Sequence, residues 1–131
     1  ALRIAKSIMV VDANPLSAQL IADYLQRMGV NYISAYDGEE ALEIVKTQCY
    51  NLRMIIIDGD LPKLNGIEAT RKIKQFLMRT KAPSIPVILC SAEEDSQNER
   101  NKPMVINLFD DFIQKPFDYH QFQKILYDYL D

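Results

Sequence analysis

Short apolar runs separated by helical patterns recur along the chain, and this alternation is the feature that most constrains the fold. Residues 7–11, 54–57 and 85–90 are apolar almost throughout. A strand with one face in water would instead alternate apolar and polar residues. Strands of this kind are buried on both faces, as in a parallel sheet covered by helices on each side. The pattern therefore predicts an α/β domain.

The run of elements predicts five strand–helix units in one domain. Further strands are expected at residues 31–36 and 111–114, and helices at residues 14–29, 39–49, 67–78 and 118–130. A fourth helix belongs at residues 93–107, where polar residues and Pro103 predict a short or irregular element. Together these elements predict an open, five-stranded, parallel doubly wound (βα)5 sheet of the flavodoxin-like type over residues 1–131.

Composition excludes several classes of protein. A chain of 131 residues with 48% hydrophobic and 25% charged residues is typical of one globular domain. Its net charge of −3 argues against nucleic-acid binding by bulk charge, and its apolar runs are far shorter than the ~20 residues that span a bilayer. Two cysteines, Cys49 and Cys90, are expected to be reduced thiols in a cytoplasmic protein. Because the first residue is Ala1, we expect the domain to be a piece of a longer protein.

Polar residues gather where the predicted strands end. Asp12 follows the first strand, Asp58 and Asp60 follow the third, Ser91 follows the fourth and Lys115 follows the fifth. The carboxyl ends of parallel strands meet at one edge of the sheet, where ligands of such folds bind. Crowded carboxylates attract a hard divalent cation such as Mg²⁺. A lysine and a hydroxyl beside them suit a phosphoryl group.

Four sequence blocks resemble the receiver domains of two-component response regulators and hybrid histidine kinases. They are IMVVDANP, IIIDGDLPKLNG, PVILCSA and DDFIQKPF, in the order that this family has them. The resemblance covers roughly residues 7–130. It implies a phosphorelay module whose partners are a histidine kinase or a histidine phosphotransfer protein, with an output domain or target protein contacted through the fourth helix, fifth strand and fifth helix.

The resemblance implies a role for each residue of the site. Asp58 would accept the phosphoryl group, Lys115 would pair with a phosphoryl oxygen after a cis bond to Pro116, and Ser91 would donate a hydrogen bond to the same group. Asp12, Asp58 and Asp60 would hold Mg²⁺, with Asp60 contributing its backbone carbonyl. Such a domain is not a conventional enzyme, since it would perform autophosphotransfer and slow acyl-phosphate hydrolysis at most.

Further positions complete or depart from the family pattern. Ala92 is small and would leave space for the phosphoryl group, and Phe112 occupies the position of an aromatic switch residue. The family has a second acid where this chain has Ala13, which would weaken Mg²⁺ binding unless the Asp60 carboxylate compensates. Leu108 and Phe109 replace a small pair of residues before the fifth strand, which predicts an altered surface at the fourth helix.

Two alternatives stay open. Ala13 motivates a degenerate receiver that binds partners without being phosphorylated. The Asp58-Gly59-Asp60 segment also resembles the nucleophile motif of aspartyl-phosphate phosphatases of the haloacid dehalogenase type. Those enzymes carry the motif near the start of a longer chain, whereas here it is central.

Overall fold

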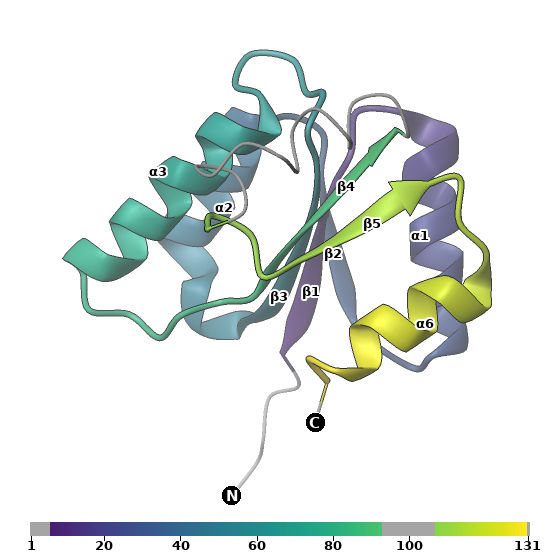
Figure 1. Cartoon of the computed structure of the whole chain (residues 1–131). Helices are drawn as coiled ribbons and strands as arrows, with labels where there is room; N and C mark the ends of the chain where they lie inside the picture. The colour runs from purple at the N-terminus through teal and green to yellow at the C-terminus, as the bar shows by residue number, and fades with distance from the viewer. Residues whose placement is uncertain (1–5, 93–106, 131) are drawn as a thin grey trace, which may run out of the picture.

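A parallel five-stranded sheet forms the centre of the molecule in the computed structural model, which describes residues 6–92 and 107–130 (Figure 1). The strand order is β2-β1-β3-β4-β5, and every neighbouring pair is parallel. This arrangement confirms the predicted doubly wound α/β fold. The strands are β1 (Ser7–Val11), β2 (Tyr32–Ala35), β3 (Leu52–Asp58), β4 (Val87–Ala92) and β5 (Asp111–Lys115).

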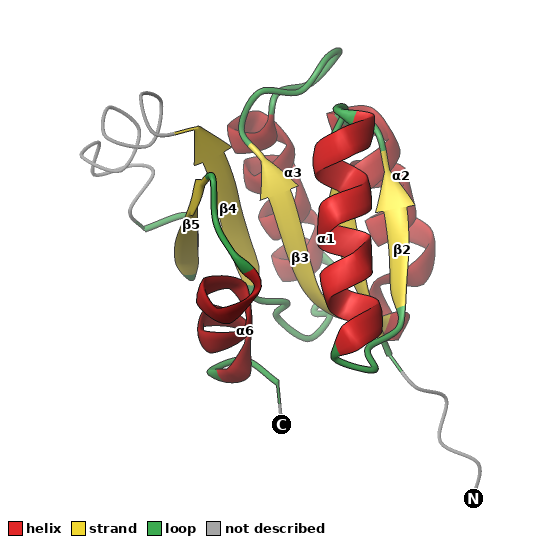
Figure 2. Cartoon of the chain, turned by 90° about the vertical axis from the view of Figure 1, so that its right-hand side faces the viewer, coloured by secondary structure: helices red, strands yellow, loops and turns green. Residues whose placement is uncertain are grey.

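Helices cover both faces of the sheet (Figures 1 and 2). Helices α1 (Pro15–Arg27) and α6 (Tyr119–Tyr127) lie on one face, and α2 (Gly38–Gln48) and α3 (Gly66–Arg79) lie on the other. A 3-10 turn, η1 (Cys49–Asn51), joins α2 to β3. Two layers of helices explain why β1 and β3 are buried on both sides and apolar nearly throughout.

The core consists of two apolar layers separated by the sheet. Alternate residues of the central strands point to opposite faces: Ile55 and Ile57 pack toward α2 and α3, whereas Met54 and Ile56 pack toward α1 and α6. Phe122 of α6 is fully buried in the second layer. The central strands are therefore held firmly, and the ends of β1 and β3 present their polar residues at a fixed edge.

Three strands run further toward that edge than the sequence predicts. β4 spans Val87–Ala92 instead of residues 85–90, because Pro86 has no N–H to donate and because Ser91 and Ala92 pair with Gln114 and Lys115. β3 extends to Asp58 and β5 to Lys115. Asp58, Ser91 and Lys115 thus lie within the ends of strands, rather than after them.

Helix boundaries agree with the predicted ranges to within a few residues, with side-chain caps at the N-termini. Asn14, Asp37, Asn65 and Asp118 each accept a hydrogen bond from a backbone N–H in the first turn of the helix that follows. The last helix ends earlier than predicted, at Tyr127.

The expected irregular helix at residues 93–107 lies, except for residue 107, outside the described residues. The output surface that includes it therefore stays a prediction. Across residues 6–92 and 107–130, no helix combines the length and the apolar character that crossing a membrane requires.

Candidate functional site

The sheet register brings two carboxylates to the same edge. Val11 of β1 pairs with Ile57 of β3, so the next residues, Asp12 and Asp58, lie beside each other at the carboxyl ends of neighbouring strands. The backbone N–H of Asp12 also donates to the Ala35 carbonyl of β2 at 3.1 Å. Asp12 is therefore fixed by the sheet itself, and its exposed fraction is 2%.

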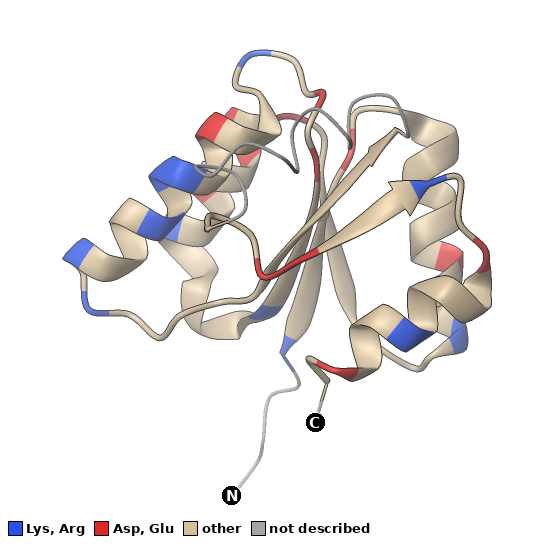
Figure 3. Ribbon diagram, in the orientation of Figure 1, with Lys and Arg blue, Asp and Glu red and all other residues tan. Residues whose placement is uncertain are grey.

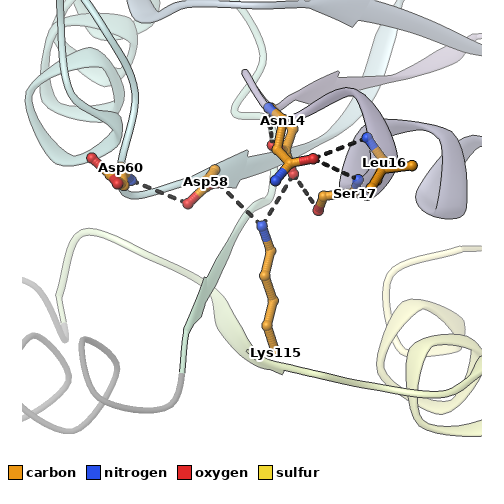
Figure 4. Close-up of polar contacts among 7 residues, drawn as sticks. Asn14, Leu16, Ser17, Asp58, Asp60 and Lys115 are labelled. Carbon is orange, nitrogen blue, oxygen red and sulfur yellow. Dashed lines mark hydrogen bonds and ion pairs between the residues drawn. The ribbon is translucent and has the colours of Figure 1, made fainter.

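Lys115 connects these two carboxylates (Figure 4). Its Nζ lies 3.1 Å from Asp58 Oδ2 and 3.2 Å from Asp12 Oδ2. The lysine comes from the end of β5, and its peptide bond to Pro116 is cis, as the resemblance implies. The structure thus brings together three of the predicted site residues from three strands.

Asp12 also accepts hydrogen bonds from the start of α1. The Asn14 backbone N–H donates to Oδ1 at 2.9 Å, and the Ser17 hydroxyl donates to Oδ2 at 2.6 Å. With the Lys115 ammonium, three donors stabilise this buried carboxylate, as a buried charge requires.

Asp58 has a less polar environment. Its Oδ1 accepts the Asp60 backbone N–H at 3.1 Å, and its Oδ2 accepts Lys115. Burial is the largest influence on its carboxyl group and raises its pKa above the ordinary value. The Asp60 N–H and the Lys115 charge oppose this effect, while the negative charge of Asp12 adds to it.

The Lys115 ammonium shows the complementary effect. Burial alone would lower its pKa, but the surrounding groups outweigh burial and raise it, so the side chain is cationic at neutral pH. The groups responsible are Cys90, Asp58 and Asp12. Burial raises the pKa of Cys90 to about 12, so near neutral pH this residue is a thiol and the two carboxylates act on Lys115.

A hollow opens beside Asp58. Its volume is about 350 Å³, and Asp58, Gly59, Asp60 and Ser91 line it together with Asn65, Ile67 and Leu89. Ser91 is a buried residue of β4 that reaches this hollow. The predicted nucleophile and the predicted hydroxyl donor thus share one cavity, large enough for a small anionic group.

The oxygen donors at this edge suit a magnesium ion. Mg²⁺ is usually held by one or two carboxylates together with water and substrate phosphate, and Asp12 and Asp58 provide two carboxylates. Asp60 is exposed, and its carboxylate is directed away from Asp58 and Lys115 (Figure 4). Among residues 6–92 and 107–130, no three His, Cys, Asp or Glu side chains are grouped so that they could bind a metal. Ala13 is exposed beside Asp12 and adds no third carboxylate.

Close backbone packing holds the loop between β3 and α3. The Gly66 N–H donates to the Gly59 carbonyl at 3.0 Å. A Cβ at Gly66 would lie 2.1 Å from the Asp58 carbonyl oxygen, and a Cβ at Gly38 would lie 1.9 Å from that of Leu64. The missing side chains at Gly38 and Gly66 therefore let two helices approach the segment that carries Asp58.

Other cations and aromatic residues lie outside this cluster. Basic residues gather along α3 (Figure 3), where Arg71 pairs with Glu68, and Lys74 lies 3.5 Å from Asp110. Phe112 is half-buried and contacts Phe109, with ring centroids 5.9 Å apart. The bulky Phe109 is buried in the core layer on the side of α2 and α3. The switch role of Phe112 stays a prediction.

An apolar groove runs beside Lys115. Its volume is about 600 Å³, and its walls come from α1, the end of β4 and the segment after β5. Leu16 and Leu20 on α1 are 83% and 41% exposed, although their spacing matches that of the buried Ile21 and Leu25. The helical pattern of the sequence did not distinguish these outward residues from core residues.

Two contacts of the site were missed by sequence reasoning. The sequence predicts a helix start at Asn14 and assigns no role to Ser17, yet both residues donate to Asp12. A serine in the first turn of a helix carries no signal of its own, because serine is common at helix N-termini.

Comparison with known proteins agrees with this geometry. The family model described as the response regulator receiver domain matches residues 8–127. The autoinducer 1 sensor kinase/phosphatase LuxN of Vibrio campbellii is 28% identical over 125 residues, which are 95% of this chain and 14% of that protein. The chain thus spans a small part of the relative's length.

Two solved structures have the same fold. The receiver domain of sensor histidine kinase PA1611 from Pseudomonas aeruginosa, with a magnesium ion in its active-site cleft, has a TM-score of 0.79 and 25% identity, covering 96% of this chain and 98% of that one. The receiver domain of Saccharomyces cerevisiae Ssk1, crystallised with the histidine phosphotransfer protein Ypd1, has a TM-score of 0.81 and 23% identity, covering 95% and 88%.

The family match extends over nearly the whole chain and includes all five strands of the sheet except the first residue of β1. It rules against the phosphatase alternative, because the Asp58-Gly59-Asp60 segment lies at the third strand of a receiver fold. The chain therefore belongs to the response regulator receiver domains of two-component systems.

Proposed function

We propose that this receiver domain is a phosphoacceptor and that Asp58 is the residue phosphorylated. The observation that carries the proposal is the Lys115 ammonium, 3.1 Å from Asp58, which lines a hollow together with Ser91. A carboxylate oxygen of Asp58 would attack the phosphorus of a phosphohistidine. The new P–O bond gives an acyl phosphate, and the P–N bond breaks with its electron pair returning to the imidazole.

The neighbouring groups suit this transfer. Lys115 would neutralise a phosphoryl oxygen, and the Ser91 hydroxyl would donate to another. Asp12 and Asp58 would hold Mg²⁺, with the Asp60 carbonyl as the resemblance implies. A bound Mg²⁺ would supply positive charge against the incoming phosphoryl oxygens. The domain would perform autophosphotransfer and slow hydrolysis, with no further substrate.

Labelling by a small phosphodonor separates this function from that of a degenerate receiver. We expect acetyl phosphate to label the wild-type chain slowly, and the label to require Mg²⁺ and to be lost in hydroxylamine, as an acyl phosphate is. Ala13→Asp adds a carboxylate at an exposed position, so it should bind Mg²⁺ about tenfold more tightly and label faster.

Titration of both proteins with Mg²⁺, followed by intact-mass measurement, checks this expectation. Ala18→Asp, which adds an acid on α1 and outside the carboxylate pair, is the control and should behave like the wild type. No label at any Mg²⁺ concentration would favour the degenerate receiver. Equal affinities of the wild type and Ala13→Asp would show that the missing acid is already replaced.

The groove beside Lys115 suits a protein phosphodonor. Leu16 is 83% exposed, and Pro116 and Phe117 continue the apolar wall toward the site. An exposed apolar patch next to a reactive group is typical of a docking surface. We propose that a histidine kinase domain or a histidine phosphotransfer protein docks here, in the cytoplasm, where the free thiols of Cys49 and Cys90 would persist.

Leu16→Asp tests the docking surface. We expect it to slow transfer from a phosphorylated histidine phosphotransfer protein about tenfold or more, because a charge would enter the apolar interface. Labelling by acetyl phosphate should stay at the wild-type rate, since this small donor needs no docking. Met78→Asp is the control, because Met78 is similarly exposed at 80% but lies on α3. Equal losses with both donors would contradict a docking role.

A further inference from the structure

The hydroxyl of Ser17 makes a side-chain contact at the site that neither the resemblance nor the proposed mechanism uses. It donates to Asp12 Oδ2 at 2.6 Å, shorter than the 3.2 Å contact of Lys115 with the same atom. We propose that Ser17 is a positioning residue for Asp12. Its hydroxyl uses an acceptor position on Asp12 Oδ2 and thereby lowers the affinity of the site for Mg²⁺. This inference rests on the proposed function to the extent that Asp12 serves the metal.

The bonding capacity of Asp12 is the first step of the argument. An ionised carboxylate offers about four acceptor positions on two oxygens. The Asn14 N–H uses one on Oδ1, and Ser17 and Lys115 use two on Oδ2. Because Asp12 is 2% exposed, solvent adds little. A cation must therefore bind at the remaining acceptor position of Asp12, or displace one of the three donors.

The placement of Ser17 makes it the donor that resists displacement. Its own backbone N–H donates to the side chain of Asn14 at 3.3 Å, and Asn14 is the N-cap of α1. A serine side chain is short, so its hydroxyl cannot follow Asp12 if the carboxylate turns. The Lys115 ammonium, in contrast, lies at the end of a long flexible side chain and has Asp58 as a second partner.

Ala13, next to Asp12, makes the Ser17 contact more important for Mg²⁺ binding. With Ala13 in place of an acid, Asp12 is the carboxylate that the end of β1 supplies to the pair with Asp58. Any donor that neutralises Asp12 then competes directly with a cation for half of the carboxylate pair. Removing the Ser17 hydroxyl would leave Asp12 buried with one donor fewer, and this carboxylate would gain more from a cation.

Isothermal titration with Mg²⁺ tests the inference on four proteins. Ser17→Ala is expected to bind Mg²⁺ about threefold to tenfold more tightly than the wild type. Ser17→Thr keeps the hydroxyl and should retain the wild-type dissociation constant. Gln19→Ala, which removes a side-chain hydrogen bond to Asp23 on the same helix, controls for changes in helix stability and should also bind as the wild type does.

Each result decides the proposal. An unchanged or weaker affinity in Ser17→Ala would overturn it, and so would an equal gain in Ser17→Thr or Gln19→Ala. If Ser17→Ala does not fold, Ser17→Cys, which replaces the hydroxyl with a slightly larger and weaker donor, should also bind Mg²⁺ more tightly than the wild type. The titration needs no phosphorylation. Failure of the chain to become labelled would therefore contradict the proposed function. The inference about Ser17 would still be decided by the Mg²⁺ affinities.

Discussion

Asp58→Asn is expected to abolish phosphoryl incorporation and to raise the melting temperature. The amide keeps the shape of the side chain but provides no carboxylate to form an acyl phosphate. The loss should be complete, because in the proposed function Asp58 is the nucleophile itself and not a supporting group. Intact-mass measurement after treatment with acetyl phosphate and Mg²⁺ gives the first readout, and thermal denaturation at pH 7 gives the second.

The stability change follows from the direction of the pKa shift. Burial raises the pKa of Asp58 in the fold, so the folded chain holds this proton more tightly than the unfolded chain. The resulting stabilisation is fully present below the unfolded pKa and is lost as pH rises through the folded pKa. Above the folded pKa the carboxylate is charged and unfavourably buried, and a neutral amide removes that cost.

The loss of an ion pair opposes this gain. Lys115 would lose its 3.1 Å partner but keep Asp12 at 3.2 Å, so its charge stays compensated. Asp23→Asn, at an exposed carboxylate of α1, is the control and should be labelled like the wild type with little change in melting temperature. A hydroxylamine-labile label on Asp58→Asn would show that another carboxylate is the acceptor. A lower melting temperature would show that the ion pair outweighs burial.

The sequence predicted the sheet and its edge because a few strong rules apply there. The residues of β1 and β3 are apolar nearly throughout, which only a strand covered on both faces tolerates. Parallel strands must then end at one edge, and this places Asp12, Asp58 and Lys115 together without any knowledge of side-chain geometry. The convergence of the Asp12 and Asp58 carboxylates on the Lys115 ammonium therefore follows from the topology of the sheet.

The contacts within that edge could not be read in the same way. Ser17 reaches Asp12 because the first turn of α1 packs over the end of β1, and helical spacing alone does not fix this angle. The extension of β4 to Ala92 depends on pairing with β5, a neighbour from a distant part of the chain. Leu16 and Leu20 fit the apolar stripe of α1, but they line the groove beside Lys115 and stay exposed.

Gly66→Ala is expected to destabilise the fold by about 3 kcal/mol, which corresponds to a fall of roughly 10 °C in melting temperature for a domain of this size. The new Cβ would lie 2.1 Å from the Asp58 carbonyl oxygen and 2.9 Å from the Gly59 Cα. Both obstacles are backbone atoms between a buried strand and a helix, so they cannot turn away as a side chain can. Alanine favours the helix more than glycine does and reduces the conformational freedom of the unfolded chain, and together these effects stabilise by about 1 kcal/mol. The free-energy cost of the clash must exceed that gain.

Gly59→Ala is the matched control for this substitution, because it lies in the same loop, directly after Asp58. Its Cβ would meet Leu89 Cδ1 at 3.5 Å, an ordinary contact, so its melting temperature should stay close to that of the wild type. The displaced loop of Gly66→Ala should also move Asp58 away from Lys115 and slow labelling by acetyl phosphate at a temperature where the variant is still folded. Equal melting temperatures for the two variants would mean that the start of α3 can shift freely. In that case the close approach at Gly66 would not be what holds the phosphoacceptor strand in place.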